Sequence, residues 1–269
     1  MELGIAPLFS SSKGNSTLVW NEDTNILIDA GMPLSNIREQ MRLAGRDLRQ
    51  LDGILITHEH SDHIKGAGII SRQCDVPVYA NEKTWAAMEK TLGEVASRNR
   101  RIITTEDFYI GDLCVQGFCT SHDAACSMGY TVSCGGKKIA LMTDLGKVTS
   151  DILETVSGSS IVILEANYDP QLLLYGPYPE FLKRRIASTK GHLSNEDSGQ
   201  AAAKLVTHGC KGFILGHLSE TNNRYRRALD TVRRGLEEAG IVVGRDAALT
   251  AAKRDGLTGV FHARSRTPT

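Results

Sequence analysis

Four potential metal ligands lie within six residues, in the segment LDGILITHEHSDHIK at residues 51–65. Imidazole and carboxylate groups together suit Zn²⁺ or another transition metal. His58 and His60 are two residues apart, so an extended or turning backbone directs both side chains to one side. Asp62 and His63 follow after the chain turns, and they can face a second point near the first. A single ion would not need all four ligands, whereas two ions bound next to each other would use them.

The alternative is a surface loop that is rich in histidine by chance. The chain has only eight histidines in 269 residues, and three of them fall within these six positions. Such clustering favours a metal site, which we treat as a hypothesis based on a motif.

Two further carboxylates stand at the ends of apolar segments. Asp29 follows the apolar residues 26–28, and Asp144 follows residues 139–143. A carboxylate buried at a strand end needs polar partners, so we predict that Asp29 holds the metal segment in place by hydrogen bonds. Asp144 could be a turn residue only. With two ions expected, the sequence favours a carboxylate that bridges them.

His122 follows an apolar segment at residues 113–119. A single histidine after a strand is more often structural than a metal ligand. The first ion, however, lacks a third histidine in the 58–63 segment. We therefore predict that His122 is that ligand.

The elements that must position these groups follow from hydrophobic periodicity and turn signals. Strands are expected at residues 3–9, 17–20, 25–28, 54–56, 76–79, 102–104, 107–110, 113–119, 127–134, 137–143, 160–164, 213–215, 241–243 and 258–262. Helices are expected at residues 34–44, 66–73, 82–92, 150–156, 179–187, 194–207 and 221–239. Pro77 places the strand at 76–79 on a sheet edge. Residues 10–16, SSSKGNS, are read either as a plain hairpin loop or as an anion-binding loop.

This pattern predicts one α/β domain, residues 1–262, followed by a disordered tail at 263–269. Its halves, 1–118 and 119–262, would form two sheets packed face to face with helices outside. Ligands at strand ends from both sheets would then meet at one edge.

The composition is that of an ordinary soluble protein, with 41% hydrophobic and 23% charged residues. Lys+Arg and Asp+Glu balance at 31 each, so binding of a polyanion must depend on a local patch of basic residues. We expect no signal peptide and no membrane span. Six cysteines without a C-x-x-C pair favour reduced thiols in the cytoplasm over a disulfide framework. The sequence gives no indication of oligomeric state.

The H-x-H-x-D-H segment resembles the metallo-β-lactamase superfamily, and the other candidates occur in that family's order. The resemblance implies one ion on His58, His60 and His122, a second on Asp62, His63 and His217, and a bridge through Asp144. It implies the αββα sandwich of that family. It also implies two divalent transition-metal ions, zinc or manganese.

The second half of the chain is similar to the phosphodiesterase branch of the superfamily. There a Glu–His pair outside the metal shell protonates the leaving oxygen, and Glu165 and His192 match it. More specifically, the segments SSSKGNS, ITHEHSDHIKG, TSHDA, TDLG, YPEFLKRRI, KGHLSN and GHLSETNN resemble the WalJ/YycJ group of bacterial proteins. That group is associated with 5′→3′ exonuclease activity on double-stranded DNA. Ser11 departs from it, since the group more often has glycine there.

These features predict a phosphodiesterase in which a hydroxide held between two metal ions attacks phosphorus. Asp62 would orient the nucleophile, and His192, held by Glu165, would protonate the leaving oxygen. A structural ion pair is the other interpretation of Glu165 and His192. The chain also leaves open a small thioester or lactone hydrolase, an RNA-processing nuclease and a non-catalytic regulatory protein.

The substrate would be nucleic acid, with DNA favoured. Consecutive cations at Lys183, Arg184 and Arg185 cannot all share one helix face. Arg185 is the first choice for a phosphate contact, and a solvated helix face is the alternative. The segment 98–101 is a rival basic cluster. The residues predicted to contact substrate are Ser11, Asn15, Arg185, Ser219 and Asn222.

Overall fold

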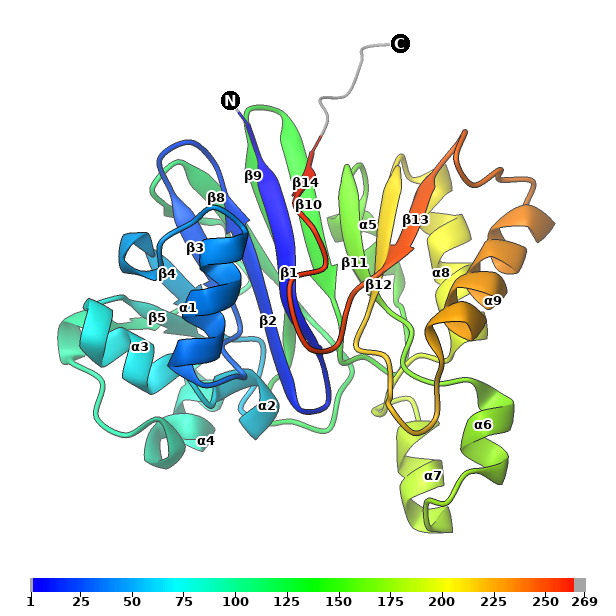
Figure 1. The fold of residues 1–269 in the computed structure, drawn as a ribbon, viewed down its shortest axis with the longest axis horizontal. Helices are drawn as coiled ribbons and strands as arrows, with labels where there is room; N and C mark the ends of the chain where they lie inside the picture. Colours follow the sequence, from blue (N-terminus) through cyan, green and yellow to red (C-terminus); the bar gives the residue numbers. More distant parts are fainter. Residues whose placement is uncertain (1, 264–269) are drawn as a thin grey trace.

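The computed structural model describes residues 2–263, in which two β-sheets pack face to face and helices cover both outer faces (Figure 1). This arrangement confirms the predicted fold class. The predicted disordered tail, 263–269, lies outside the described residues except for Ala263. The Ala263 N–H donates a hydrogen bond to the Leu3 carbonyl, so that residue belongs to the folded part.

The first sheet combines an antiparallel and a parallel part. Among the described residues its spatial order is β14 (Phe261–His262), β1 (Gly4–Ser11), β2 (Gly14–Trp20), β3 (Asn25–Ile28), β4 (Gly53–Leu55), β5 (Val78–Ala80) and β6 (Arg100–Ile102). Strands β14 to β3 are antiparallel, and β3 to β6 are parallel. The carboxyl ends of β3 and β4 therefore meet at one edge.

The second sheet repeats this mixed pattern. Among the described residues its order is β13 (Ala248–Ala251), β12 (Gly212–Gly216), β11 (Ile161–Glu165), β10 (Lys137–Met142), β9 (Met128–Cys134), β8 (Leu113–Cys119) and β7 (Phe108–Ile110). Strands β10 to β13 are parallel, and β7 to β10 are antiparallel. Consequently β10, β11 and β12 all end at the same edge of this sheet.

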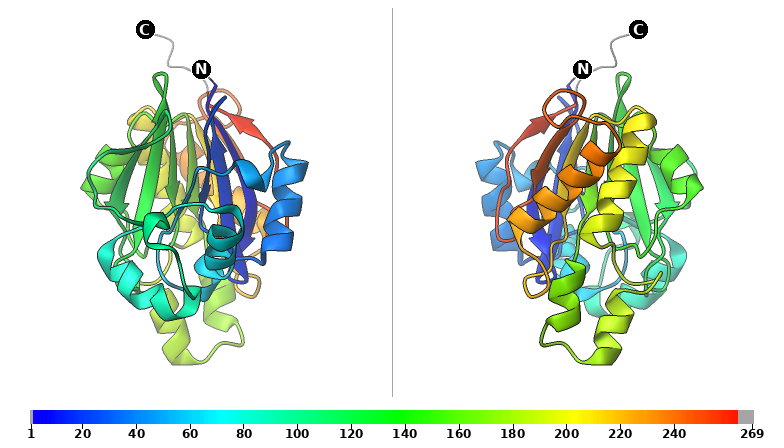
Figure 2. Two further views of the ribbon diagram at one scale, coloured as in Figure 1. Left: turned by 90° about the vertical axis from the view of Figure 1, so that its left-hand side faces the viewer. Right: turned by 90° about the vertical axis from the view of Figure 1, so that its right-hand side faces the viewer.

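The helices connect the strands and cover the sheets. They are α1 (Leu34–Leu43), α2 (Ser61–Ile64), α3 (Ala67–Cys74), α4 (Glu82–Leu92), α5 (Ser150–Val156), α6 (Pro170–Tyr175), α7 (Glu180–Ile186), α8 (Asn195–Thr207) and α9 (Tyr225–Glu238), with short 3₁₀ turns η1 (Leu48–Gln50) and η2 (Ser97–Asn99). Helices α8 and α9 lie side by side on the outer face of the second sheet (Figure 2). Over residues 2–263, no helix combines the length and apolar character needed to cross a bilayer.

Alternation along the strands explains the layers. On β11, Ile163 joins the core between the two sheets, whereas Val162 and Leu164 join the core under α5, α8 and α9. Successive strand residues point to opposite faces, so a strand that is apolar throughout is covered on both sides. The same rule applies to β3, where Ile26 and Ile28 face the second sheet and Leu27 faces the outer helices.

Several predictions about individual elements were wrong. Strand β5 is not an edge strand, because it pairs with both β4 and β6. Pro77 precedes β5 and contributes only its carbonyl, which accepts from the Ile54 N–H at 2.9 Å. Its missing N–H is therefore of no consequence there.

The boundary between the sheets also differs from the predicted one at residue 118. Strands β7 and β8 belong to the second sheet, and β14 returns to the first. The strand predicted at 241–243 is absent, and β13 follows instead at Ala248–Ala251. Helix α6 was not predicted. Most of the loop predicted at residues 10–16 is strand, with a turn only at Ser12 and Lys13.

Candidate metal centre and active site

The predicted site residues gather where the strands of both sheets end. Asp29 follows β3, the histidine-rich segment follows β4, and Asp144 and His217 follow β10 and β12. Asp29, Asp144 and His217 have φ values of 61°, 57° and 54°. Residues other than glycine rarely adopt this left-handed backbone conformation, and such strain is concentrated at functional sites. It turns each side chain from its strand end toward the shared edge.

Three histidines form the first group of potential ligands. His58, His60 and His122 place ring nitrogens within 4.8 Å of one another. The Nε2 atom of His58 lies 3.0 Å from Nδ1 of His60. His122 donates from Nδ1 to the Gly191 carbonyl at 3.1 Å, which leaves its Nε2 directed toward the group. These three residues are the ligands that the sequence predicted for the first of two ions.

Asp62, His63 and His217 form the second group, again within 4.8 Å. Nδ2 of Asn15 donates to Asp62 Oδ2 at 3.2 Å and contacts His63 Nε2 at 3.1 Å. The Ser10 hydroxyl accepts from the His217 N–H at 2.8 Å. The β1–β2 hairpin of the first sheet therefore holds this group against the end of the second.

Asp144 lies between the two groups and is almost fully buried. Its Oδ1 is 3.9 Å from His122 Nε2 and 3.2 Å from His217 Nδ1, and its Oδ2 is 3.6 Å from His63 Nε2. Among the described residues, Asp144 Oδ2 and His217 Nε2 are buried without a hydrogen-bond partner. Unpartnered buried polar atoms are rare, and a cation would satisfy both. The donor set thus fits metal ions.

Electrostatics at this edge favours positive charge. Burial alone would lower the pKa of His63, but the carboxylates of Asp29 and Asp144 outweigh it and raise that pKa to about 10. The pKa of His217 likewise rises to about 9 against the effect of burial, because Asp144 and Glu165 lie beside it. Carboxylates that outweigh burial in this way would equally attract a divalent cation.

Asp29 supports the histidine-rich segment. It accepts hydrogen bonds from the Thr57 N–H and hydroxyl, both at 2.8 Å, and from His63 Nδ1 at 2.7 Å. These contacts fix the orientation of the His63 ring and leave its Nε2 facing Asp144 and Asp62. Asp29 thus makes the kind of hydrogen bonds that the sequence predicted for it.

Asp29→Ala is expected to weaken metal binding by roughly 10- to 100-fold, the usual effect of losing a partner of a ligating histidine. Competition with a fluorescent chelator would measure the affinity. Asp23→Ala, an exposed residue of the β2–β3 turn, is the matched control. Unchanged metal affinity in a folded Asp29→Ala protein would show that the His63 orientation does not depend on this carboxylate.

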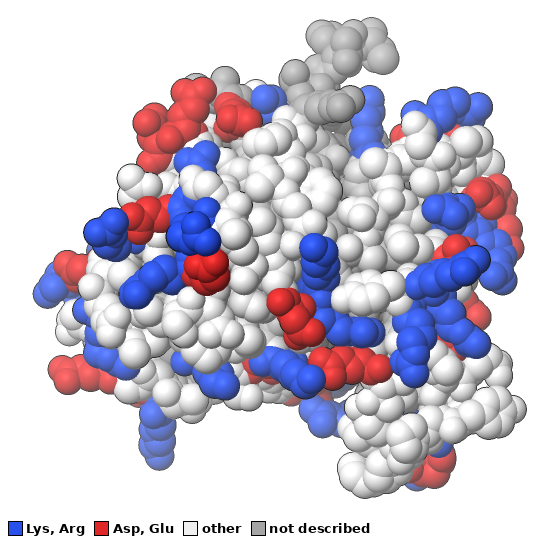
Figure 3. All heavy atoms as spheres, viewed as in Figure 1, with Lys and Arg blue, Asp and Glu red and all other residues white. Residues whose placement is uncertain are grey.

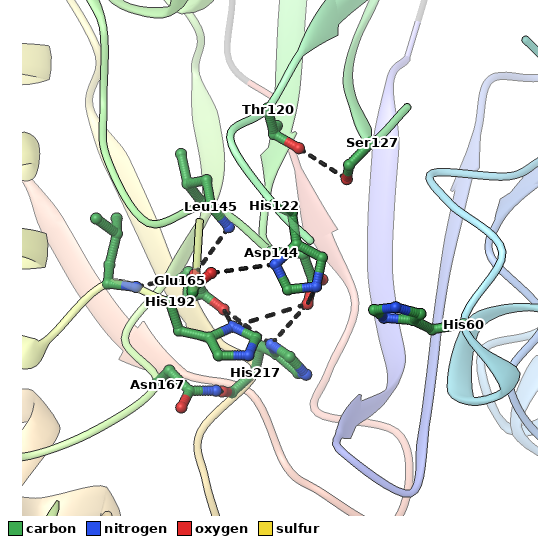
Figure 4. A network of polar contacts seen from close by, with 12 residues as sticks. His60, Thr120, His122, Ser127, Asp144, Leu145, Glu165, Asn167, His192 and His217 are labelled. Atoms are coloured by element: carbon green, nitrogen blue, oxygen red, sulfur yellow. Dashed lines mark hydrogen bonds and ion pairs between the residues drawn. The ribbon is translucent and has the colours of Figure 1, made fainter. Parts of the chain in front are cut away.

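Glu165 is fully buried at the end of β11 and connects two histidines (Figure 4). Its Oε1 accepts from His192 Nδ1 at 2.9 Å and His217 Nδ1 at 2.8 Å, and its Oε2 accepts from the Leu145 and Leu193 N–H groups, both at 3.1 Å. Burial would raise the pKa of Glu165, but these histidines lower it to about 2. The predicted Glu165–His192 pair is present. The contact with His217 was not foreseen, since nothing in the sequence joins these positions.

A pocket of about 210 Å³ opens beside this network. His192 and His217 form its inner wall, and helix α7 forms the outer one with Leu182 and Arg185. Arg185 is paired with Asp123, whose other oxygen lies 3.3 Å from His122 Nε2. Asp123 is a site residue that sequence reasoning missed, although its position directly after His122 was a signal.

The other residues predicted to contact substrate differ in their position relative to the pocket. Ser219 lines the pocket. Ser11 is buried within β1, and Asn15 is turned toward Asp62 and His63. Asn222 is fully buried and does not line the pocket.

The rival basic cluster at 98–101 makes other contacts. Arg98 pairs with Asp75, and Arg100 pairs with Glu89 and lies over the Trp85 ring. Arg98 precedes β6 and Arg100 begins it, so both lie at the amino end of this strand. The ligands follow the carboxyl ends of β3 and β4, which run parallel to it. Arg185, by contrast, lines the pocket beside His192.

Comparisons with known proteins show which family this chain is similar to. A family model described as a Beta-lactamase superfamily domain matches residues 24–217. The chain is 40% identical over 245 residues to exodeoxyribonuclease YycJ of Bacillus anthracis, covering 91% of this chain and 93% of that protein. It is 39% identical over 244 residues to exodeoxyribonuclease WalJ of Streptococcus pneumoniae strain D39, covering 89% and 90%.

Among solved structures, the metallo-β-lactamase fold protein YhfI from Bacillus subtilis is similar, with a TM-score of 0.72 and 14% identity. The match covers 97% of this chain and 100% of that one. At this identity the likeness concerns the fold alone.

Proposed function

The chain belongs to the metallo-β-lactamase superfamily and, within it, to the YycJ/WalJ group, and from this premise we propose that it is a metal-dependent DNA exonuclease. The substrate is double-stranded DNA, digested from the 5′ end. The observation that carries the proposal is the Glu165–His192 contact at 2.9 Å, beside a cluster of imidazoles and carboxylates. Six cysteines without a C-x-x-C pair suit a cytoplasmic enzyme.

Two divalent ions, zinc or manganese, are proposed to occupy the two ligand groups. His58, His60 and His122 would hold one, and Asp62, His63 and His217 the other. Asp144 would contact both. When bound, the ions would supply a water of lowered pKa and positive charge for the phosphate oxygens. Asp62, at the mouth of the second group, would also accept a hydrogen bond from the attacking water and orient it.

His192 is proposed as the acid that protonates the leaving oxygen. Its side chain is 19% exposed and lines the pocket, while Glu165 is completely buried behind it. The Glu165 carboxylate accepts from Nδ1 and fixes the orientation of the ring. The other ring nitrogen, Nε2, is then the proton donor. Hydrolysis of a small thioester needs no such acid, since a thiolate leaves readily, and this weighs against a thioesterase.

Arg185 is proposed to contact the DNA backbone near the cleaved bond. It lines the pocket beside His192 and is exposed enough to exchange Asp123 for a phosphate. A guanidinium binds phosphate through two parallel hydrogen bonds. The Asp123 carboxylate would keep the Arg185 side chain at the pocket until DNA arrives.

Duplexes with a label at one 5′ or one 3′ end test the proposal. The purified protein with Zn²⁺ or Mn²⁺ is expected to release labelled mononucleotides early from the 5′-labelled strand, and chelation is expected to stop the reaction. Elemental analysis should give two metal ions per chain. Intact DNA with every metal tested, together with hydrolysis of a thioester or lactone, would contradict the assignment.

A further inference from the structure

Large apolar side chains stand exposed on the helical hairpin formed by α6 and α7. Leu174, Tyr175 and Phe181 are 55%, 80% and 69% exposed. The hairpin projects from the end of the molecule that carries the site, as both side views show (Figure 2). Exposing this much apolar surface is unfavourable in water, and patches of this kind mark interaction sites.

The hairpin is anchored, so the exposure is not that of a frayed segment. Asp169 caps α6 by accepting hydrogen bonds from the Gln171 and Leu172 N–H groups. Leu173 is buried. Lys183 Nζ donates to the Leu174 carbonyl at 2.7 Å, which joins α7 to the end of α6. Tyr175 and Phe181 are therefore presented on an ordered support.

The same hairpin forms the outer wall of the catalytic pocket. Tyr178, Leu182 and Arg185 line that pocket together with His192. Residues three or four apart share a helix face, so Leu182 and Arg185 line the pocket from one face of α7. Phe181 is four residues before Arg185, and its exposed ring therefore lies at the margin of that face.

Charge indicates which partner fits this surface. In the space-filling view the projecting hairpin is mostly uncharged at its tip, and cations lie nearer to the body of the molecule (Figure 3). Arg184 and Arg185 are exposed and lie on the same short helix as Phe181. Aromatic rings beside cations bind single-stranded nucleic acid, because rings stack on bases while cations meet phosphates.

We propose that Tyr175 and Phe181 form a stacking platform for unpaired bases at the end of the DNA substrate. This inference rests on the proposed nuclease function and specifies the kind of end that the enzyme prefers. Removing nucleotides from one strand leaves the other strand unpaired beside the cleft. The platform holds this uncleaved, unpaired strand beside the pocket. The enzyme therefore binds a duplex with an overhang more tightly than a blunt one.

The test compares binding of nuclease-resistant phosphorothioate duplexes, blunt or with an overhang of either polarity, to the metal-loaded protein. The overhang carries 2-aminopurine, whose fluorescence falls on stacking. The double variant Tyr175→Ala/Phe181→Ala is expected to bind the overhang duplex roughly 5- to 100-fold more weakly, the range for losing base–aromatic stacking, and to lose the quenching. Blunt-duplex binding and hydrolysis of bis(p-nitrophenyl) phosphate are expected to remain unchanged.

Tyr109→Ala is the matched control. Tyr109 is 69% exposed on β7 and pairs with Cys114, at the end of β8 away from the site. The Tyr109→Ala variant should retain overhang binding in full.

Equal binding of the overhang duplex by the double variant and the wild type would overturn the platform while leaving the nuclease assignment intact. A loss of self-association instead, with DNA binding unaltered, would overturn it in favour of a second copy of the chain. Failure of the wild type to bind any duplex would overturn the nuclease proposal itself.

Discussion

Asp144→Asn is expected to reduce DNA cleavage by roughly 10³-fold or more, because metal ions contribute several kcal/mol of transition-state stabilisation and each 1.36 kcal/mol is a factor of ten. Asparagine preserves the size of the side chain but removes its charge. In the structure that charge lies between His122, His63 and His217 at 3.2–3.9 Å. No other described carboxylate reaches both ligand groups in this way. Its loss should release at least one of the two proposed ions.

The measurement is metal content per folded chain together with the rate on duplex DNA. Asp230→Asn is the matched control, since Asp230 lies on the exposed face of α9 and pairs only with neighbouring arginines. Circular dichroism would establish that both variants fold. Two ions per chain and a wild-type rate in Asp144→Asn would exclude a bridging role for this carboxylate.

His192→Ala is expected to slow DNA cleavage by roughly 10²- to 10⁴-fold, the usual contribution of a positioned general acid. Metal content should remain at the wild-type level, because the ring is held by Glu165 and is not in either predicted ligand group. On bis(p-nitrophenyl) phosphate the loss should be much smaller. Nitrophenolate leaves readily without a proton, so the acid contributes little to that reaction.

Comparing the two substrates separates an acid from a structural residue. A structural role for His192 would reduce both rates equally, and that result would refute the proposed acid. His208→Ala serves as the control, because His208 is an exposed histidine at the end of α8 whose ring contacts Lys204 and Thr207 of the same helix. It should match the wild type on both substrates. Titrating metal into both variants would reveal any hidden effect on the metal centre.

The sequence alone determined the fold class and the candidate ligands. Alternation and helical spacing identified most strands and helices, because burial on one or both faces imposes a periodicity that is visible in the chain. The cluster at 58–63 was visible for another reason, since its members are close in the sequence. Apolar strands that end in Asp29 or Asp144 could be recognised because a carboxylate there is costly without partners. The resemblance to the metallo-β-lactamase superfamily then ordered the remaining candidates, and the comparisons confirm that family.

The burial of individual side chains was decided by tertiary structure. Asn222 was predicted to contact substrate, yet it is fully buried. Ser11 is part of β1 instead of a loop. Pro77 suggested a sheet edge, but β6 pairs outside β5. A local signal describes what one residue can tolerate, whereas exposure depends on which distant segment packs against it.

Contacts between strand ends were likewise settled only by the fold. Glu165 meets His217, 52 positions later, because β11 and β12 are parallel neighbours that end together. Arg185 meets Asp123 because helix α7 returns over the end of the second sheet (Figure 1). Side-chain direction along one strand follows from a period of two and can be read from sequence. Which strands become neighbours, and hence which strand-end side chains share an edge, depends on long-range pairing, and no spacing within a single segment encodes that.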